Sequence, residues 1–319
     1  MPQPVVPPSG VWCPAVTLFD EADELVLEDQ ASYFSYLAKS GLAGLLVLGT
    51  NAETFLLTRK ERRELVKTAR EAVGPGFPIM AGVGGHSTKQ VLEYIHDAAS
   101  AGADYVLVLP PAYFGAKLTT PAVLQGFFGD VARAAEASGL GVVVYNFPGV
   151  CNGVDLDSAA IAAIARRHPG RVTGVKLTCG SVAKITRLAA ELPAEDFAVF
   201  GGQSDFLLGG LAVGSAGCIA AFANVFPKTI VRVYQLWKEG RGAEALALHR
   251  KAALAEQAVK SGGIAAVKYA ASIFSAPKAG VKGAEGLMKP RRPYLELGEG
   301  EKRAIREALA EVAEVENSL

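Results

Sequence analysis

The sequence predicts an α/β fold, a closed (β/α)8 TIM barrel with a C-terminal helical extension. Short runs rich in β-branched residues alternate with longer segments of helical periodicity from near the start to about residue 240. Several runs, such as residues 105–109, are almost continuously apolar, which is typical of parallel strands covered by helices on both faces. Eight such units of a strand and a helix are the number that closes this barrel.

The expected strands lie at regular intervals along the chain. They cover residues 11–19, 44–50, 78–84, 103–109, 141–147, 172–178, 197–202 and 217–222. Two of the helices between them begin with a capping-box pattern, a hydroxyl followed three residues later by a carboxylate or an amide. The pairs are Thr58 with Glu61 and Ser87 with Gln90.

Beyond residue 240 the strand pattern stops and helical patterns follow at about 242–260, 263–275 and 300–316. Residues 277–293 are rich in Gly, Pro and Lys, which indicates a loop. We therefore expect a catalytic barrel at residues 1–240 and, in the same domain, a helical extension at residues 241–319.

The balance of charge favours a small-molecule partner. The 319 residues include 32 basic and 32 acidic side chains, so no net field draws the chain to nucleic acid or to an anionic membrane. The four cysteines are widely separated, without the paired spacing of a zinc site or the density of a disulfide scaffold, which favours reduced thiols. The histidines lack the spacing of a shared metal site.

The location expected from the sequence is the cytosol. No apolar run approaches the roughly 20 residues that cross a bilayer. The first residues, rich in proline, resemble neither a signal peptide nor a mitochondrial presequence.

Lys176 is the most informative residue, because it interrupts an apolar strand where an ammonium group is costly to bury without a partner. In this architecture the reacting groups lie where strands end. A desolvated, neutral lysine can attack a carbonyl carbon and form a Schiff base. The alternative, a structural lysine that is ion-paired or extends to solvent, is disfavoured because a strand that is buried on both faces offers little route to solvent.

Tyr145 lies at the matching end of the neighbouring strand, and its phenol could transfer protons to a substrate bound at Lys176. By itself it would be interpreted as an aromatic core residue. Its combination with Lys176 and with Thr50, which follows the second strand, favours a catalytic role.

These segments together resemble the dihydrodipicolinate synthase and N-acetylneuraminate lyase family of class I, pyruvate-type aldolases. The resemblance covers almost the whole chain, and its motifs are highly specific as a set. They occupy residues 49–53, 145–148, 174–178, 223–224 and 291–293.

The resemblance implies a role for each of five residues. Lys176 forms the Schiff base, Tyr145 transfers protons, and Thr50 and Asn51 bind the carboxylate of the pyruvyl group. Tyr113 matches a tyrosine that the family donates across a subunit contact to a relay with Thr50 and Tyr145, and the family implies a homotetramer. The substrate is then a 2-oxo acid held covalently on Lys176, and no cofactor or metal is needed.

Other positions bear on the substrate. The synthase of lysine biosynthesis has an arginine where this chain has Val150, which cannot pair with a second carboxylate. Thr178 offers a hydroxyl, as in the sugar-acid aldolases of the family, and Gly202 and Ile219 are implied to contact substrate. The family usually has glycine where Ala52 stands, so a positive φ there would strain the loop by about 1 kcal/mol.

Within the family, residues 178–180 together with residues 145–149 resemble the fungal 2-keto-3-deoxy-L-galactonate aldolases. We therefore expect cleavage of L-threo-3-deoxy-hexulosonate to pyruvate and glyceraldehyde. The alternative is a 4-hydroxy-2-oxoglutarate aldolase, which forms pyruvate and glyoxylate and also has asparagine at the position of Asn51. A barrel that only binds a 2-oxo acid is disfavoured, because Lys176, Tyr145 and Thr50 are all present.

Overall fold

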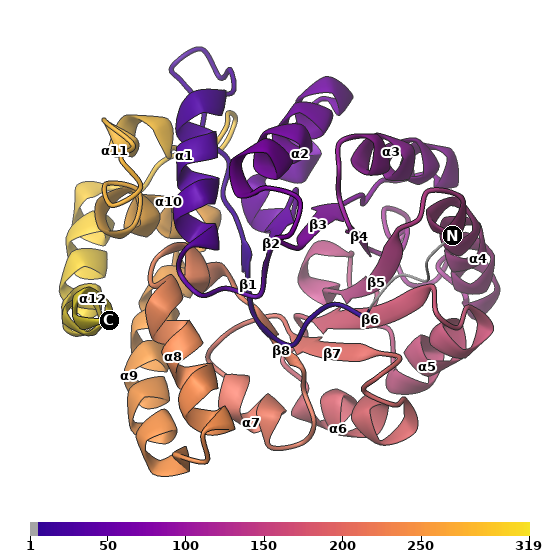
Figure 1. Cartoon of the computed structure of the whole chain (residues 1–319). Coiled ribbons are helices and arrows are strands. Elements are labelled where there is room, and N and C mark those ends of the chain that lie inside the picture. The colour runs from indigo at the N-terminus through magenta and orange to yellow at the C-terminus, as the bar shows by residue number, and fades with distance from the viewer. Residues whose placement is uncertain (1–5) are drawn as a thin grey trace.

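The computed structural model describes residues 6–319, and in it eight parallel strands close into a barrel in chain order (Figure 1). This confirms the predicted fold. The strands are β1 (Gly10–Pro14), β2 (Gly44–Val47), β3 (Ile79–Gly82), β4 (Tyr105–Val108), β5 (Gly141–Asn146), β6 (Val172–Leu177), β7 (Ala198–Gly201) and β8 (Gly217–Ile219).

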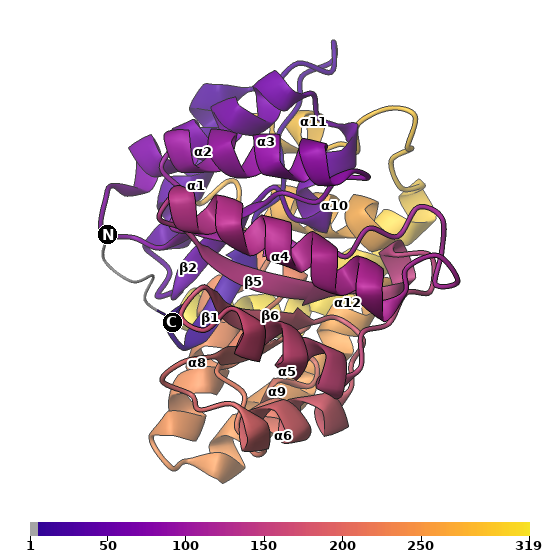
Figure 2. The ribbon, with the colours of Figure 1, turned by 90° about the vertical axis from the view of Figure 1, so that its right-hand side faces the viewer.

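Helices surround the barrel and continue beyond it. The barrel helices are α1 (Leu27–Ala38), α2 (Arg59–Val73), α3 (Thr88–Ser100), α4 (Pro121–Ala137), α5 (Ser158–Arg167), α6 (Val182–Glu191), α7 (Leu207–Leu211) and α8 (Pro227–Lys238). After them come α9 (Gly242–Ser261), α10 (Gly263–Phe274), α11 (Ala284–Leu287) and α12 (Glu299–Ser318). In Figure 2 α4, α5 and α6 lie in front of the strands, and the C-terminal helices lie behind them.

Three details differ from the sequence-based expectations. Every strand ends before its predicted end, because the apolar pattern continues into buried loop segments such as the 3-10 turn η4 (Ala221–Asn224). The expected loop at residues 277–293 contains the single-turn helix α11, which buries Ala284 and Met288. Thr58 and Glu61 form the full capping box. In the second box the hydroxyl of Ser87 accepts from the backbone N–H of Gln90, but the side chain of Gln90 accepts from the backbone of His86 and not from that of Ser87.

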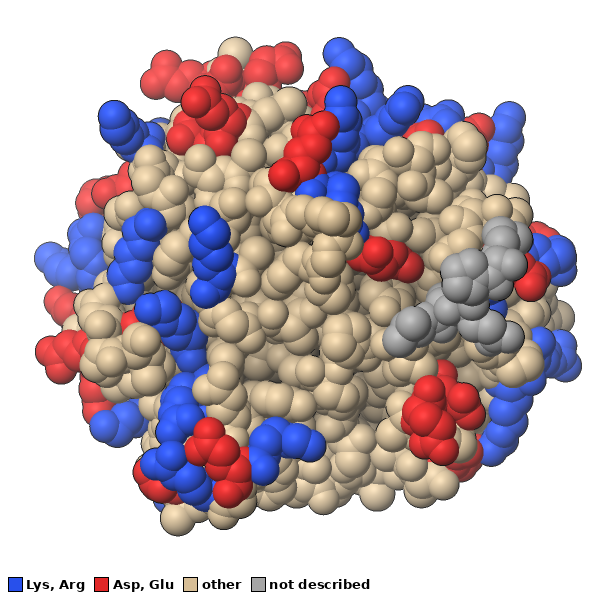
Figure 3. Space-filling model, viewed as in Figure 1, with Lys and Arg blue, Asp and Glu red and all other residues tan. Residues whose placement is uncertain are grey.

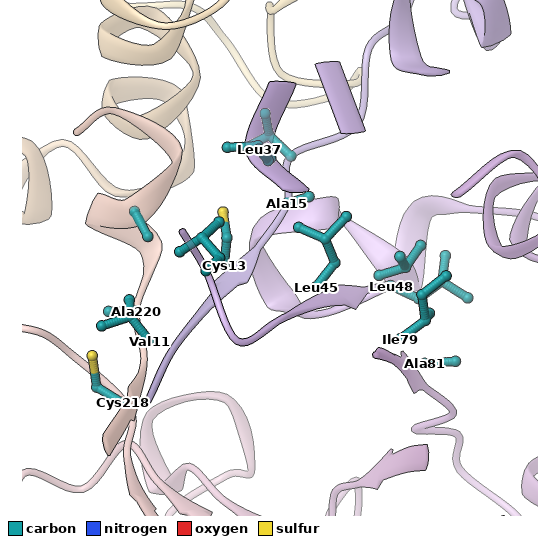
Figure 4. Packing of buried hydrophobic residues seen from close by; sticks show 14 of the residues in the cluster. Val11, Cys13, Ala15, Leu37, Leu45, Leu48, Ile79, Ala81, Cys218 and Ala220 are labelled. Carbon is teal, nitrogen blue, oxygen red and sulfur yellow. The ribbon is translucent and has the colours of Figure 1, made fainter. Parts of the chain in front are cut away.

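Successive side chains of each strand point alternately out of and into the barrel, and this creates two apolar layers. On β1, Val11 and Cys13 pack outward with Leu37 of α1 and Leu45 of β2 (Figure 4). Trp12 points inward, where residues of several strands fill the centre of the barrel. The barrel is therefore a packed core, and only its ends are open to solvent.

Charged side chains of both signs lie around the edge of the face seen in Figure 3, and the centre of that face carries few charges. Among residues 6–319 no helix is long and apolar enough to cross a membrane.

Candidate active site

Lys176 points into the barrel because its neighbours on β6 point outward. Val175 and Leu177 pack in the layer between strands and helices, so the side chain between them faces the interior. Lys176 is 2% exposed, and its strand partners are Tyr145 on β5 and Phe200 on β7. The parallel register thus brings Lys176 and Tyr145 to one level of the barrel.

The buried residues Lys176 and Tyr145 form one group with the half-buried Thr50. Nζ of Lys176 lies 4.5 Å from the centre of the Tyr145 ring, and the Tyr145 hydroxyl lies 3.3 Å from Oγ1 of Thr50. Among residues 6–319 Lys176 forms no ion pair, whereas Lys268, also buried, pairs with Glu53. The amine of Lys176 is therefore close to a proton donor and not engaged by a carboxylate.

Cys13 and Cys218, the buried thiols that interact electrostatically with Lys176, supply no counter-ion either. Burial raises the pKa of Cys13 and of Cys218, and the positive charge of Lys176 opposes this only in smaller measure. Both thiols are accordingly neutral at physiological pH.

Thr50 and Asn51 lie in the 3-10 turn η1 (Thr50–Ala52), which begins three residues after the end of β2. The left-handed backbone conformation falls on Glu53, with a φ of 57°, and not on Ala52. The strain expected at Ala52 is therefore absent, and the hydroxyl of Thr17 instead donates to the carbonyl oxygen of Ala52 at 2.8 Å.

Thr178 is the first residue after β6. Its hydroxyl is buried and has no hydrogen-bond partner among residues 6–319. Gly202, the first residue after β7, fits against it only because it has no side chain: a Cβ there would lie 2.0 Å from Oγ1 of Thr178. Ile219 lies fully buried in the inner layer that also contains Tyr145.

Among residues 6–319 the hydroxyl of Tyr113 forms no hydrogen bond with Thr50 or Tyr145. Tyr113 is 69% exposed, and its ring packs edge-on against His86 at 5.3 Å and Phe114 at 5.2 Å. Its expected contribution to a neighbouring subunit's site therefore stays a prediction.

The asparagines of two family motifs are structural. Asn146 accepts from the backbone of Leu156 at 2.9 Å and donates to Asp155 at 2.7 Å. Asn224 accepts from the backbone of Val16 at 3.0 Å. Both side chains fix the loops that surround the barrel mouth.

Sequence reasoning missed the role of Lys268. It is the one charged residue in the otherwise apolar helix α10, which is the same signal that singled out Lys176. Its partner Glu53 follows η1, so the pair reaches the loop that carries Thr50 and Asn51. A cavity of about 400 Å³, lined by residues that include Thr50, Glu53, Ile264 and Tyr294, separates parts of this loop from the C-terminal helices.

Comparison with known proteins identifies the same family that the sequence motifs resemble. Residues 7–312 match the model of the dihydrodipicolinate synthetase family. The chain belongs to this family. Family membership makes it an enzyme, a lyase that acts on carbon–carbon bonds.

Fungal members of the family are among its relatives. A Coccidioides immitis protein, provisionally named mitochondrial 4-hydroxy-2-oxoglutarate aldolase, is 63% identical over 99% of each chain. The L-threo-3-deoxy-hexylosonate aldolase of Hypocrea jecorina is 34% identical over 98% of each chain.

Solved structures of the family share the architecture. A family protein from Coccidioides immitis has a TM-score of 0.92 with 60% identity, covering 99% of each chain. YagE of E. coli K12, crystallised in complex with pyruvate, has a TM-score of 0.85 with 26% identity, covering 95% of this chain and 98% of its own.

The relatives support the alternative substrate better than the sugar acid that the sequence analysis placed first. A second fungal relative, from Emericella nidulans, also bears a provisional name as a mitochondrial 4-hydroxy-2-oxoglutarate aldolase and is 37% identical over 99% of this chain and 98% of its own. Both names place those proteins in mitochondria, which differs from the cytosol expected here from the N-terminus.

Proposed function

We propose that this chain is a Schiff-base aldolase that cleaves 4-hydroxy-2-oxoglutarate to pyruvate and glyoxylate. The observation that carries the chemistry is a buried lysine, free of any ion pair among residues 6–319, beside a phenol that is itself hydrogen-bonded to a loop hydroxyl. The 63% identity to a relative with the provisional name of such an aldolase supports the choice of substrate.

The first half of the proposed reaction forms the covalent intermediate. Thr50 and Asn51 hold the C1 carboxylate of the substrate through their hydroxyl and amide donors. The neutral amine of Lys176 attacks C2, and Tyr145 donates the proton with which the carbinolamine loses water. The product of this half is an iminium that joins Lys176 to the substrate.

The second half breaks the C3–C4 bond. The Tyr145 phenolate takes the proton of the C4 hydroxyl, the bond electrons move into the iminium, and glyoxylate leaves as the aldehyde product. Tyr145, now protonated, returns this proton to C3 of the resulting enamine. Water then hydrolyses the imine, which releases pyruvate and restores Lys176.

Thr178 supports binding of the distal end of the substrate. A buried hydroxyl without a partner is unfavourable unless a ligand satisfies it, and a carboxylate oxygen is a strong acceptor for such a donor. The same hydroxyl could bind the hydroxyls of a sugar acid, so L-threo-3-deoxy-hexulosonate is the second candidate, as the Hypocrea jecorina relative also suggests.

A direct comparison of the two substrates tests the proposal. Pyruvate release, coupled to lactate dehydrogenase, is measured for purified protein with each compound over a range of concentrations. We expect kcat/KM for 4-hydroxy-2-oxoglutarate to exceed that for the sugar acid by about 10-fold or more. The opposite ratio would replace the first substrate by the second, and no pyruvate from either would refute the aldolase itself.

A further inference from the structure

The buried pair of Glu53 and Lys268 ties the C-terminal extension to the proposed carboxylate loop. Nζ of Lys268 in α10 donates to Oε1 of Glu53 at 2.7 Å, and the two side chains are 0% and 2% exposed. The second carboxylate oxygen of Glu53 accepts from the backbone N–H of Arg291 at 2.7 Å. Two separate segments of the extension therefore hold one carboxylate.

Glu53 is continuous with the turn that carries Thr50 and Asn51. Its backbone N–H donates to the carbonyl oxygen of Thr50 at 3.0 Å, and its φ of 57° is left-handed. A non-glycine residue keeps such a conformation only where its surroundings determine it. The contacts to Lys268 and Arg291 supply that determination.

Neighbouring contacts fix the rest of this loop. The guanidinium of Arg291 donates to the carbonyl oxygen of Leu56 at 3.1 Å and to Glu61 at 2.6 Å. Burial lowers the pKa of Lys268, and the adjacent Glu53 carboxylate opposes this change. The ammonium form of Lys268 thus depends on Glu53.

Stability alone does not account for such a pair. Replacing a buried ion pair by apolar groups of similar volume is often neutral or stabilising, whereas removing one partner leaves an uncompensated charge. What this pair provides is a defined geometry for Glu53 and hence for the turn before it.

We infer that Lys268 and Glu53 are positioning residues for the carboxylate of the 2-oxo acid, acting through Thr50 and Asn51. The inference rests on the proposed function, in which those two residues bind that carboxylate. Loss of the pair should weaken binding equally in the ground state and the transition state, which raises KM and leaves kcat nearly unchanged.

Borohydride trapping of pyruvate on Lys176 measures this binding without the cleavage substrate. In wild-type protein the reduced three-carbon adduct on Lys176 is quantified by peptide mass spectrometry as pyruvate is varied. In Lys268→Met we expect the half-saturating pyruvate concentration to rise by about 10-fold or more, since a displaced turn would weaken the charge-assisted hydrogen bonds to the carboxylate. The maximal adduct yield should stay close to that of the wild type.

A double variant separates positioning from stability. Glu53→Gln combined with Lys268→Met leaves no charge at this buried pair, and the glutamine oxygen can still accept from Arg291. We expect its unfolding temperature to recover relative to Lys268→Met while the half-saturating concentration stays raised. Recovery of both together would reduce the pair to a structural role and overturn the inference.

Glu316→Gln is the matched control. Glu316 of α12 is also a buried carboxylate of the extension, and it accepts from the backbone and the hydroxyl of Thr229 in α8, each at 2.7 Å. This variant should unfold at a lower temperature yet bind pyruvate as the wild type does. A raised half-saturating concentration here too would contradict the inference.

The outcomes distinguish this inference from the proposed function. An adduct on wild-type Lys176 together with unchanged half-saturation in Lys268→Met would overturn the inference alone. If wild-type Lys176 forms no adduct, the proposed function fails and the inference fails with it.

Discussion

Lys176 and Lys268 are chemically identical side chains, and their surroundings give them different tasks. Lys268 is buried on α10, and its charge is neutralised by the carboxylate of Glu53 at 2.7 Å. Lys176 is similarly buried, but its amine lies over the ring of Tyr145. A carboxylate would hold the amine protonated, whereas a phenol can exchange a proton with it.

The contribution of that phenol can be measured with Tyr145→Phe. The ring is retained, so packing around Lys176 should persist and the unfolding temperature should change little. The hydroxyl that lies 3.3 Å from Thr50 is lost, and kcat should fall by roughly 10²-fold, as expected for a positioned acid-base group. Steady-state kinetics that show a near-normal kcat would return Tyr145 to a purely structural role.

Among the elements, α9 fixes the loop after β7 as α10 fixes the loop after β2. Glu256 of α9 accepts from the backbone N–H of Ser204 at 3.2 Å and from its hydroxyl at 2.5 Å. Nε2 of His249, about two turns earlier on the same face of α9, lies 2.7 Å from the carbonyl oxygen of Ser204. Because Ser204 follows Gly202 closely, the C-terminal helices set the shape of the barrel mouth on two sides.

Through Glu256, α9 makes the unfolding free energy depend on pH. Burial raises the pKa of Glu256 to about 7, with Asp205 adding to the rise and with Ser204 and Lys260 opposing it. Between the unfolded value near 4.5 and about 7 the folded state binds more protons, so this group's stabilising contribution is lost as pH rises through that window. Glu256→Gln removes the effect.

Urea unfolding of wild type and Glu256→Gln from pH 5 to pH 8 tests this. The unfolding free energy of the variant relative to the wild type should increase by about 2–3 kcal/mol across the range. Tyr36→Phe, in a helix on another side of the barrel, serves as a control that should show no such trend below pH 8. A constant difference between Glu256→Gln and wild type would show that Glu256 does not titrate there.

At the scale of the whole molecule, the barrel carries an exposed group of large apolar side chains that a single chain leaves uncovered. Tyr113, Phe114 and Leu118 are 69%, 75% and 60% exposed and lie in the segment between β4 and α4. Clustered apolar exposure of this kind marks an interaction site. It supports the proposal, first made from the family resemblance, that the chain forms a homotetramer in which Tyr113 completes a neighbouring site.

Two substitutions separate the ring of Tyr113 from its hydroxyl. Tyr113→Phe keeps the apolar contact, so light scattering should show an unchanged assembly while kcat falls by roughly 10-fold through loss of the proton relay. Phe114→Asp should break the assembly, because a carboxylate would be buried without a partner, and activity should fall with it. A fully active monomer would contradict this arrangement.

Local patterns in the sequence determined the parts of this protein that depend on short-range physics. The period of apolar residues predicted all eight strands and the long C-terminal helices, because alternation and helical periodicity are properties of neighbouring residues. The charge on an apolar strand singled out Lys176 for the same reason. The full cap at Thr58 depends only on residues one turn away.

The tertiary structure decided what depends on distant parts of the chain meeting. The pairing of Glu53 with Lys268 joins residues 215 positions apart, and the fit of Gly202 against Thr178 arises only where two strands end side by side. The left-handed residue after η1 is Glu53 and not Ala52, because the loop is held by contacts from α10 and Arg291. Such contacts depend on packing in three dimensions, and no local pattern encodes which distant partner a buried polar group will find.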